Sequence, residues 1–128
     1  MSSNDRKAVR ISESEWQVMS MVWNRSPIAA GDIVDALTRR TGWHSRTIRT
    51  LLDRLVKKGA LKTKLDGKRY LYEPLLMMEA CMRQESRSFL QRVFAGEPAP
   101  MILYLVKESK LSNEEIKELK RLLSQKEK

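Results

Sequence analysis

The chain of 128 residues is 41% hydrophobic, with mean hydropathy −0.50 and net charge +9, a composition that excludes a disordered chain and a membrane-spanning protein. Its longest apolar run, Met101 to Val106, is far shorter than the roughly 20 residues of a spanning helix, and its polar first ten residues lack the apolar core of a secretion signal. The single cysteine, Cys81, has no disulfide partner within the chain, so we expect a cytoplasmic protein without membrane insertion.

Three helices are predicted in the first sixty residues. The first follows Ser12, which has the spacing of a capping box with Glu15, and continues to about residue 25. The second runs over residues 30–40 and the third over residues 45–58. The third helix has the clearest apolar stripe, which consists of Ile48, Leu51, Leu52, Leu55 and Val56.

A hairpin follows these helices. Residues 61–65 alternate between apolar and polar side chains, Asp66-Gly67 is a turn signal, and residues 69–72 form the returning strand. Both tyrosines of the returning strand are expected to pack against the third helix. Three short helices and then a hairpin are the order of a winged helix-turn-helix, which we assign to residues 1–74.

Residues 75–128 are predicted to be a helical dimerisation domain, so that the fold is mainly α with a small β-hairpin. A long helix covers residues 76–94, an apolar segment covers 101–107, and a last helix begins at Ser112, with Glu115 at capping-box spacing. A winged helix of this size cannot cover all their apolar surface, whereas a symmetric partner can. The predicted dimer residues are Met78, Met82, Phe89, Val93, Ile102, Leu105, Ile116, Leu119 and Leu123.

Positive charge is concentrated in one stretch of the sequence. Residues 1–74 contain 15 Lys and Arg against 8 Asp and Glu, whereas residues 75–128 contain 10 against 8. Within the first part, residues 46–69 hold nine cations and two anions, a net charge of +7. A typical surface mixes both signs, so this local excess indicates a site for a polyanion.

The third helix and the hairpin are suited to bind duplex DNA. The side of the helix opposite its apolar stripe carries Arg46, Thr50, Asp53 and Lys57, and a helix of this kind fits the major groove. Cations of the hairpin suit phosphates or the adjacent minor groove. The predicted DNA-binding residues are Arg46, Thr47, Arg49, Thr50, Arg54, Lys57, Lys62, Lys64, Lys68 and Arg69.

The inventory of reactive residues argues against an enzyme. One histidine and one cysteine lie far apart in the sequence, and no glycine-rich loop, zinc-ligand spacing or inward pair of carboxylates is visible. We therefore expect no catalytic residue, no metal and no cofactor. The one histidine, His44, lies at the start of the third helix, where it caps the helix or contacts a phosphate.

Four segments of the sequence resemble the BlaI/MecI family of penicillinase repressors. They are residues 11–19 with 22–23 and 26–27, residues 43–60, residues 67–74, and residues 85–96. The likeness covers about residues 11–123, in matching order and spacing. The copper-responsive CopY relatives carry a pair of Cys-x-Cys motifs at the C-terminus, which this sequence lacks, so copper sensing is disfavoured.

The resemblance implies a homodimeric bacterial repressor that binds an inverted-repeat operator of β-lactam-resistance or stress genes. By matching position, Arg46, Thr47, Thr50 and Arg54 face the bases or their phosphates, with Lys64 and Arg69 from the wing. It also implies induction by a sensor-linked protease that cuts the C-terminal arm. Staphylococcal-type members are cut at an Asn-Phe bond, and the corresponding bond here is Tyr104-Leu105.

Two alternatives remain open at this point. One is a winged-helix regulator that releases DNA when a small ligand enters a pocket between its dimer helices, without proteolysis. The other is a winged-helix adaptor that binds proteins, against which the basic stretch at residues 46–69 argues. Salt-dependent binding of a duplex is expected of the repressor and of the ligand-responsive regulator, but not of the adaptor.

Overall fold

The computed structural model describes residues 9–127. The chain divides into two compact units inside one helix, α5 (Met78–Phe94), with the boundary between Glu85 and Ser86. The predicted division after residue 74 lies eleven residues earlier. The start of α5 belongs with the first unit because Cys81 is buried there and the Gln84 side chain donates a hydrogen bond to the Val9 carbonyl at 3.0 Å.

The three predicted helices of the first unit are confirmed to within about a residue at each end. They are α2 (Glu13–Arg25), α3 (Ala30–Thr41) and α4 (Ser45–Lys58). The capping box at the start of α2 is also confirmed. The Glu15 amide donates to the Ser12 hydroxyl at 3.1 Å, and the Ser12 amide donates to the Glu15 carboxylate at 2.8 Å.

The hairpin is part of a three-stranded antiparallel sheet. Its strands are β2 (Leu61–Asp66) and β3 (Arg69–Pro74), and a short strand that the sequence did not predict, β1 (Ile28–Ala29), pairs with the other edge of β3. The two-residue connection between β2 and β3 begins with Gly67, whose φ of 66° favours glycine.

The core of the first unit lies between α2, α3, α4 and the base of the sheet. The indole nitrogen of Trp23 donates to the Leu76 carbonyl at 2.8 Å, which ties the segment after β3 to α2. Because one side of α4 is locked into this core, its opposite side is left at the surface. The completely or almost completely buried apolar side chains are Val18, Met19, Val22, Ile33, Leu37, Ile48, Leu52, Leu55, Ala60 and Leu61.

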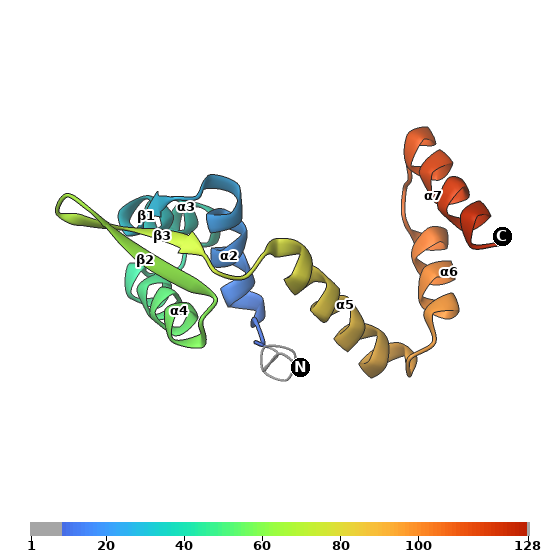
Figure 1. Cartoon of the computed structure of the whole chain (residues 1–128), viewed down its shortest axis with the longest axis horizontal. Helices are drawn as coiled ribbons and strands as arrows, with labels where there is room; N and C mark the ends of the chain where they lie inside the picture. The colour runs from blue at the N-terminus through green and yellow to red at the C-terminus, as the bar shows by residue number, and fades with distance from the viewer. Residues whose placement is uncertain (1–8, 128) are drawn as a thin grey trace. The chain divides into compact units, whose positions relative to one another are not determined.

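The two faces of the hairpin differ, because alternate side chains of a strand point to opposite sides. Leu61 is buried in the core, and Tyr72, which shares its face, packs against the same core. Tyr70 lies on this face too but is 57% exposed, so the prediction that both tyrosines pack inward is wrong for Tyr70. The reason is that the hairpin projects beyond α3 and α4, as Figure 1 shows, and its outer half has no helix beneath it.

The second unit contains the remainder of α5 and two further helices, α6 (Pro98–Glu108) and α7 (Asn113–Lys126). The predicted apolar segment, residues 101–107, is thus part of α6. Pro98 and Pro100 precede it and are tolerated because they lie in the first turn of this helix. The capping box of Ser112 and Glu115 is confirmed. None of the described residues of this unit, 86–127, is buried. In the part of the chain that the structure describes, no helix is long and apolar enough to cross a membrane.

Candidate nucleic-acid interface

The outer face of α4 is held in place by a cap at each end of the helix and by the packing of its apolar side in the core. At its start the Arg46 amide donates to Nδ1 of His44 at 3.0 Å, which confirms the capping role of this histidine. At its end Gly59 takes a φ of 83° as the C-cap. With its apolar side in the core, the helix presents six of the predicted DNA-binding residues at the surface: Arg46, Thr47, Arg49, Thr50, Arg54 and Lys57.

Thr50 has its polar group engaged within the helix. Its hydroxyl donates to the Arg46 carbonyl at 2.9 Å. The methyl group and the acceptor lone pairs of the hydroxyl therefore remain for contacts outside the chain. A threonine methyl can pack against the methyl group of thymine in the major groove, whereas Arg46 can donate two hydrogen bonds to a guanine edge.

Arg49 and Asp53 lie one helical turn apart on the side of α4 that faces the hairpin. Burial raises the pKa of the Tyr72 hydroxyl on β3, the negative charge of Asp53 raises it further, and the positive charge of Arg49 opposes both effects. Both charges therefore lie near Tyr72. Asp53 also lies in one row with Arg46 and Thr50, as the sequence predicts for this helix.

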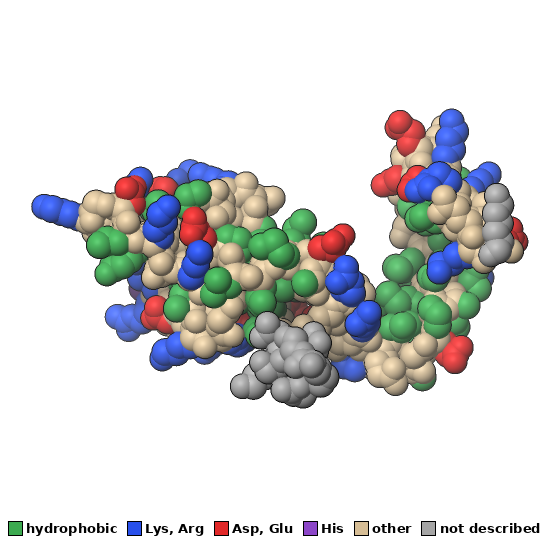
Figure 2. Space-filling view, in the orientation of Figure 1, with side chains coloured by type: hydrophobic (Ala, Val, Ile, Leu, Met, Phe, Trp, Pro, Cys, Tyr) green, Lys and Arg blue, Asp and Glu red, His purple; other side chains and the backbone are tan. Residues whose placement is uncertain are grey.

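The predicted cations of the hairpin are divided between its turn and the face opposite Leu61. Lys62 and Lys64 lie on that outer face, where the Lys62 ammonium is 3.8 Å from the Glu73 carboxylate. Lys68 lies in the turn. Arg69 begins β3 on the same outer face as Lys62 and Lys64, and its guanidinium is 3.8 Å from the Asp66 carboxylate. Such long, exposed ion pairs contribute little and leave both cations available. Figure 2 shows Lys and Arg side chains gathered over α4 and along the hairpin.

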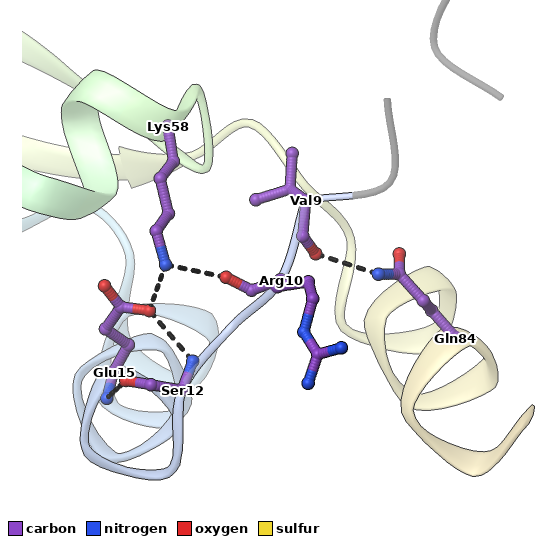
Figure 3. A network of polar contacts seen from close by, with 6 residues as sticks. All are labelled: Val9, Arg10, Ser12, Glu15, Lys58 and Gln84. Carbon is purple, nitrogen blue, oxygen red and sulfur yellow. Dashed lines mark hydrogen bonds and ion pairs between the residues drawn. The ribbon is translucent and has the colours of Figure 1, made fainter. Parts of the chain in front are cut away.

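Sequence reasoning missed an ion pair that fixes the far end of α4. Lys58 donates to the Glu15 carboxylate at 2.5 Å and to the Arg10 carbonyl at 2.7 Å, as Figure 3 shows. Glu15 is only 1% exposed. Burial raises the pKa of its carboxyl, but the hydrogen bonds from Lys58 and Ser12 and the charge of Lys58 outweigh burial and lower the pKa below its ordinary value. The last turn of α4 is thus tied to the start of α2.

Replacement of Lys58 by methionine is expected to lower the free energy of unfolding by about 1–3 kcal/mol, because it leaves the buried Glu15 carboxylate without a counter-ion. The value lies below the range for fully buried pairs because the Lys58 side chain is 34% exposed, so water screens the interaction. Urea unfolding at neutral pH measures the loss. Lys57→Met is the matched control, one residue away on the same helix, and an equal loss in both variants would contradict a specific role for Lys58.

The same ion pair predicts a dependence of stability on pH. Because folding lowers the pKa of Glu15, its contribution is present above the ordinary glutamate pKa and is lost as the pH falls through the lowered value. Wild type should therefore lose more stability in acid than the double variant Glu15→Gln with Lys58→Met, which has no charge at either position. If the two proteins lost equal free energy of unfolding as the pH falls, the pair of Glu15 and Lys58 would not be the cause of the loss of stability in acid.

The chain is similar to known bacterial repressors over most of its length. The sequence matches the penicillinase repressor family over residues 11–125. The chain belongs to this family. It is 34% identical to the methicillin resistance regulatory protein MecI of Staphylococcus aureus over 95% of this chain and 99% of that protein, and 34% identical to the penicillinase repressor of Bacillus licheniformis over 94% of each.

A solved structure matches part of the chain. It is the solution structure of the monomeric form of BlaI from Bacillus licheniformis in complex with the blaP half-operator, 34% identical with a TM-score of 0.51, and the match covers 55% of this chain and 85% of that chain. Together with the family match, it confirms the predictions of a winged-helix fold, of a DNA-binding repressor family and of a protein that is not an enzyme. Within residues 9–127, no three His, Cys, Asp or Glu side chains are grouped so that they could hold a metal ion.

Proposed function

We propose that this member of the penicillinase repressor family acts in the cytoplasm as a homodimer and represses transcription by binding an inverted-repeat DNA operator. The observation that carries the proposal is the outer face of α4, where cationic and threonine side chains are exposed on a helix whose other side is buried. The BlaI monomer that this chain resembles was solved on a half-operator, and this supports the same use of the winged helix here.

In the proposed complex, α4 lies in the major groove and the hairpin lies over the neighbouring backbone. Arg46 and Thr50, near the start of α4, reach base edges, with Thr47, Arg49 and Arg54 beside them. Lys57 at the other end of the helix and Lys68 and Arg69 at the hairpin turn contact phosphates. Lys62 and Lys64, on the outer face of the hairpin, add positive potential that attracts the duplex.

Substitutions on α4 are expected to separate base reading from phosphate contact. Arg46→Ala should relax the preference at one operator position, at a cost of about 1–3 kcal/mol in binding to the preferred base. Lys57→Ala should weaken binding to every sequence alike, because a phosphate contact carries no base information. Fluorescence anisotropy with a set of single-base operator variants measures both. If Arg46→Ala weakened binding to all operator variants equally, Arg46 would not contact a base.

The homodimer is supported by the exposed apolar surface of the chain. Most of the predicted dimer residues, including Met78, Met82, Val93 and Leu123, are exposed by about half, and Leu119 is partly covered. In the second unit, an apolar cavity of about 340 Å³ is lined by Phe89, Val93, Phe94, Met101, Tyr104 and Leu105. A unit in which none of residues 86–127 is buried gains little from its own packing, so a second copy of the chain must supply the cover.

Two charged substitutions in this surface are expected to convert the dimer into monomers. A carboxylate at Phe89 and another at Leu119 would have to be desolvated in the interface, which costs several kcal/mol for each site. Sedimentation should then show half the wild-type mass for Phe89→Asp with Leu119→Asp. Both residues are outside the first unit, so thermal unfolding of the winged helix serves as the control. A double variant with the wild-type mass would reject the interface.

Release from the operator is proposed to follow a cut in α6 by a sensor-linked protease. The Tyr104-Leu105 bond lies in the middle of this helix, and the two side chains are 59% and 48% exposed. A protease requires an extended substrate, so α6 must open locally before the bond is cut. The names of the relatives support β-lactam-resistance genes as the proposed targets.

A further inference from the structure

The outer half of the hairpin carries a pair of large apolar side chains that the fold does not use. Leu65 on β2 is opposite Tyr70 on β3 in the register of the sheet. They are 60% and 57% exposed, although each belongs to a strand whose base is anchored in the core. Figure 1 shows the hairpin projecting past the helices at this point, and Figure 2 shows hydrophobic side chains among cationic ones near its end.

The pair lies on the α4 side of the hairpin. Alternation along the strands places Leu65 and Tyr70 on the same face as Leu61 and Tyr72, which pack against the core. Leu61 and Tyr72 pack in one core with the apolar side of α4, and α4 contacts β2, so α4 borders this face. A duplex seated on the outer side of α4 is therefore placed to meet this face of the hairpin.

The charges beside the pair indicate which surface it contacts. Lys68 and Arg69 continue the hairpin directly beyond Leu65 and Tyr70, and the nine cations and two anions of residues 46–69 make this part of the chain strongly positive. An apolar contact framed by cations is complementary to a duplex backbone, in which the C–H groups of the sugars lie between phosphates. The charge thus favours DNA over an apolar protein partner.

We propose that Leu65 and Tyr70 pack against the deoxyribose walls of the minor groove next to the α4 site, and supply a part of the DNA affinity that does not depend on salt. This inference rests on the proposed function, because it requires a duplex seated on α4. It assigns the hairpin two separate contributions. Lys68 and Arg69 neutralise phosphates, and the apolar pair removes sugar and side-chain surface from water.

The test uses the full-length chain and a short mixed-sequence duplex that contains no selected operator, because sugar contacts do not depend on sequence. Leu65→Thr with Tyr70→Thr keeps residues that suit a strand while it removes apolar surface. We expect about a tenfold loss of affinity at every salt concentration, which corresponds to ~60 Å² of apolar contact in the whole complex, with an unchanged slope of log K against log salt. Lys68→Ala should instead make the slope shallower.

Two controls make the result specific to the pair. Leu75→Thr removes a similarly exposed leucine (49%) outside the hairpin and should leave the affinity unchanged, and Tyr70→Phe should recover most of the affinity that Tyr70→Thr loses. A photo-crosslinking amino acid at position 70 should attach to the duplex, whereas one at position 75 should not. Wild-type binding together with full affinity of the double threonine variant and no crosslink at position 70 would overturn the inference. Absence of wild-type binding would overturn the proposed function itself.

Discussion

A chain truncated after residue 103 is expected to bind its full operator 10²- to 10⁴-fold more weakly than the intact chain at the same salt concentration. The truncation removes the second half of α6 and all of α7, including Ile116, Leu119 and Leu123, and leaves every proposed DNA contact in place. Each winged helix then binds one half-site alone, without the effective concentration that a linked partner provides. A single half-site complex differs little from non-specific binding, so the operator is vacated.

The control for the truncation is a duplex that contains only one half-site. On this duplex the truncated and intact chains should bind with similar affinity for each winged helix, because the core of the first unit is complete within the truncated chain. A loss on the half-site as well would indicate damage to the winged helix. Equal affinity of both chains for the full operator would show that the C-terminal arm is dispensable, and the proposed release by cleavage would then be wrong.

Operator affinity is expected to fall about 10⁴-fold when the monovalent salt concentration rises from 50 to 200 mM. If each subunit neutralises about 4 phosphates, a dimer neutralises about 8, and the slope of log K against log salt is near −7. The basis is the charge of residues 46–69, whose cations on α4 and the hairpin are exposed. Anisotropy titrations at five or six salt concentrations measure this slope.

Lys57→Ala tests the origin of the salt dependence. Loss of one phosphate contact per subunit should make the slope shallower by about 2 for the dimer. The matched control is Lys126→Ala, which removes a lysine at the end of α7, outside the proposed DNA-binding surface. This variant should leave the slope unchanged. A slope near zero for the wild-type chain would contradict DNA binding through this surface and would revive the protein-binding adaptor.

Most of the fold could be predicted because its signals are local in the sequence. Ser12 and Glu15, and again Ser112 and Glu115, lie three residues apart, and each pair forms the expected capping box. The apolar stripe of α4 sets which side enters the core: Ile48, Leu51, Leu52 and Leu55 are buried as predicted, whereas Val56 at the edge of the stripe is 36% exposed. The candidate site on α4 was therefore visible in the sequence before any tertiary contact was known.

The features that the sequence did not reveal depend on contacts between distant residues. Strand β1 has two residues and exists only because it pairs with β3, more than forty positions away. Lys58 and Glu15 are separated by 43 residues, and neither side chain indicates the other in the sequence. The exposure of Tyr70 depends on how far the hairpin projects past α4, which alternation along a strand cannot predict.

Selection of bound fragments from a random duplex pool by the full-length protein tests the central claim most directly. A homodimer with two exposed α4 helices should enrich a sequence with two-fold symmetry, whose half-sites are one or more helical turns apart, or about 10–10.5 base pairs per turn. The same selection with Phe89→Asp and Leu119→Asp should enrich a single half-site at best. Enrichment of a symmetric operator by the wild-type chain is the expected result, and a bound pool with no enriched sequence would contradict a sequence-specific dimeric repressor.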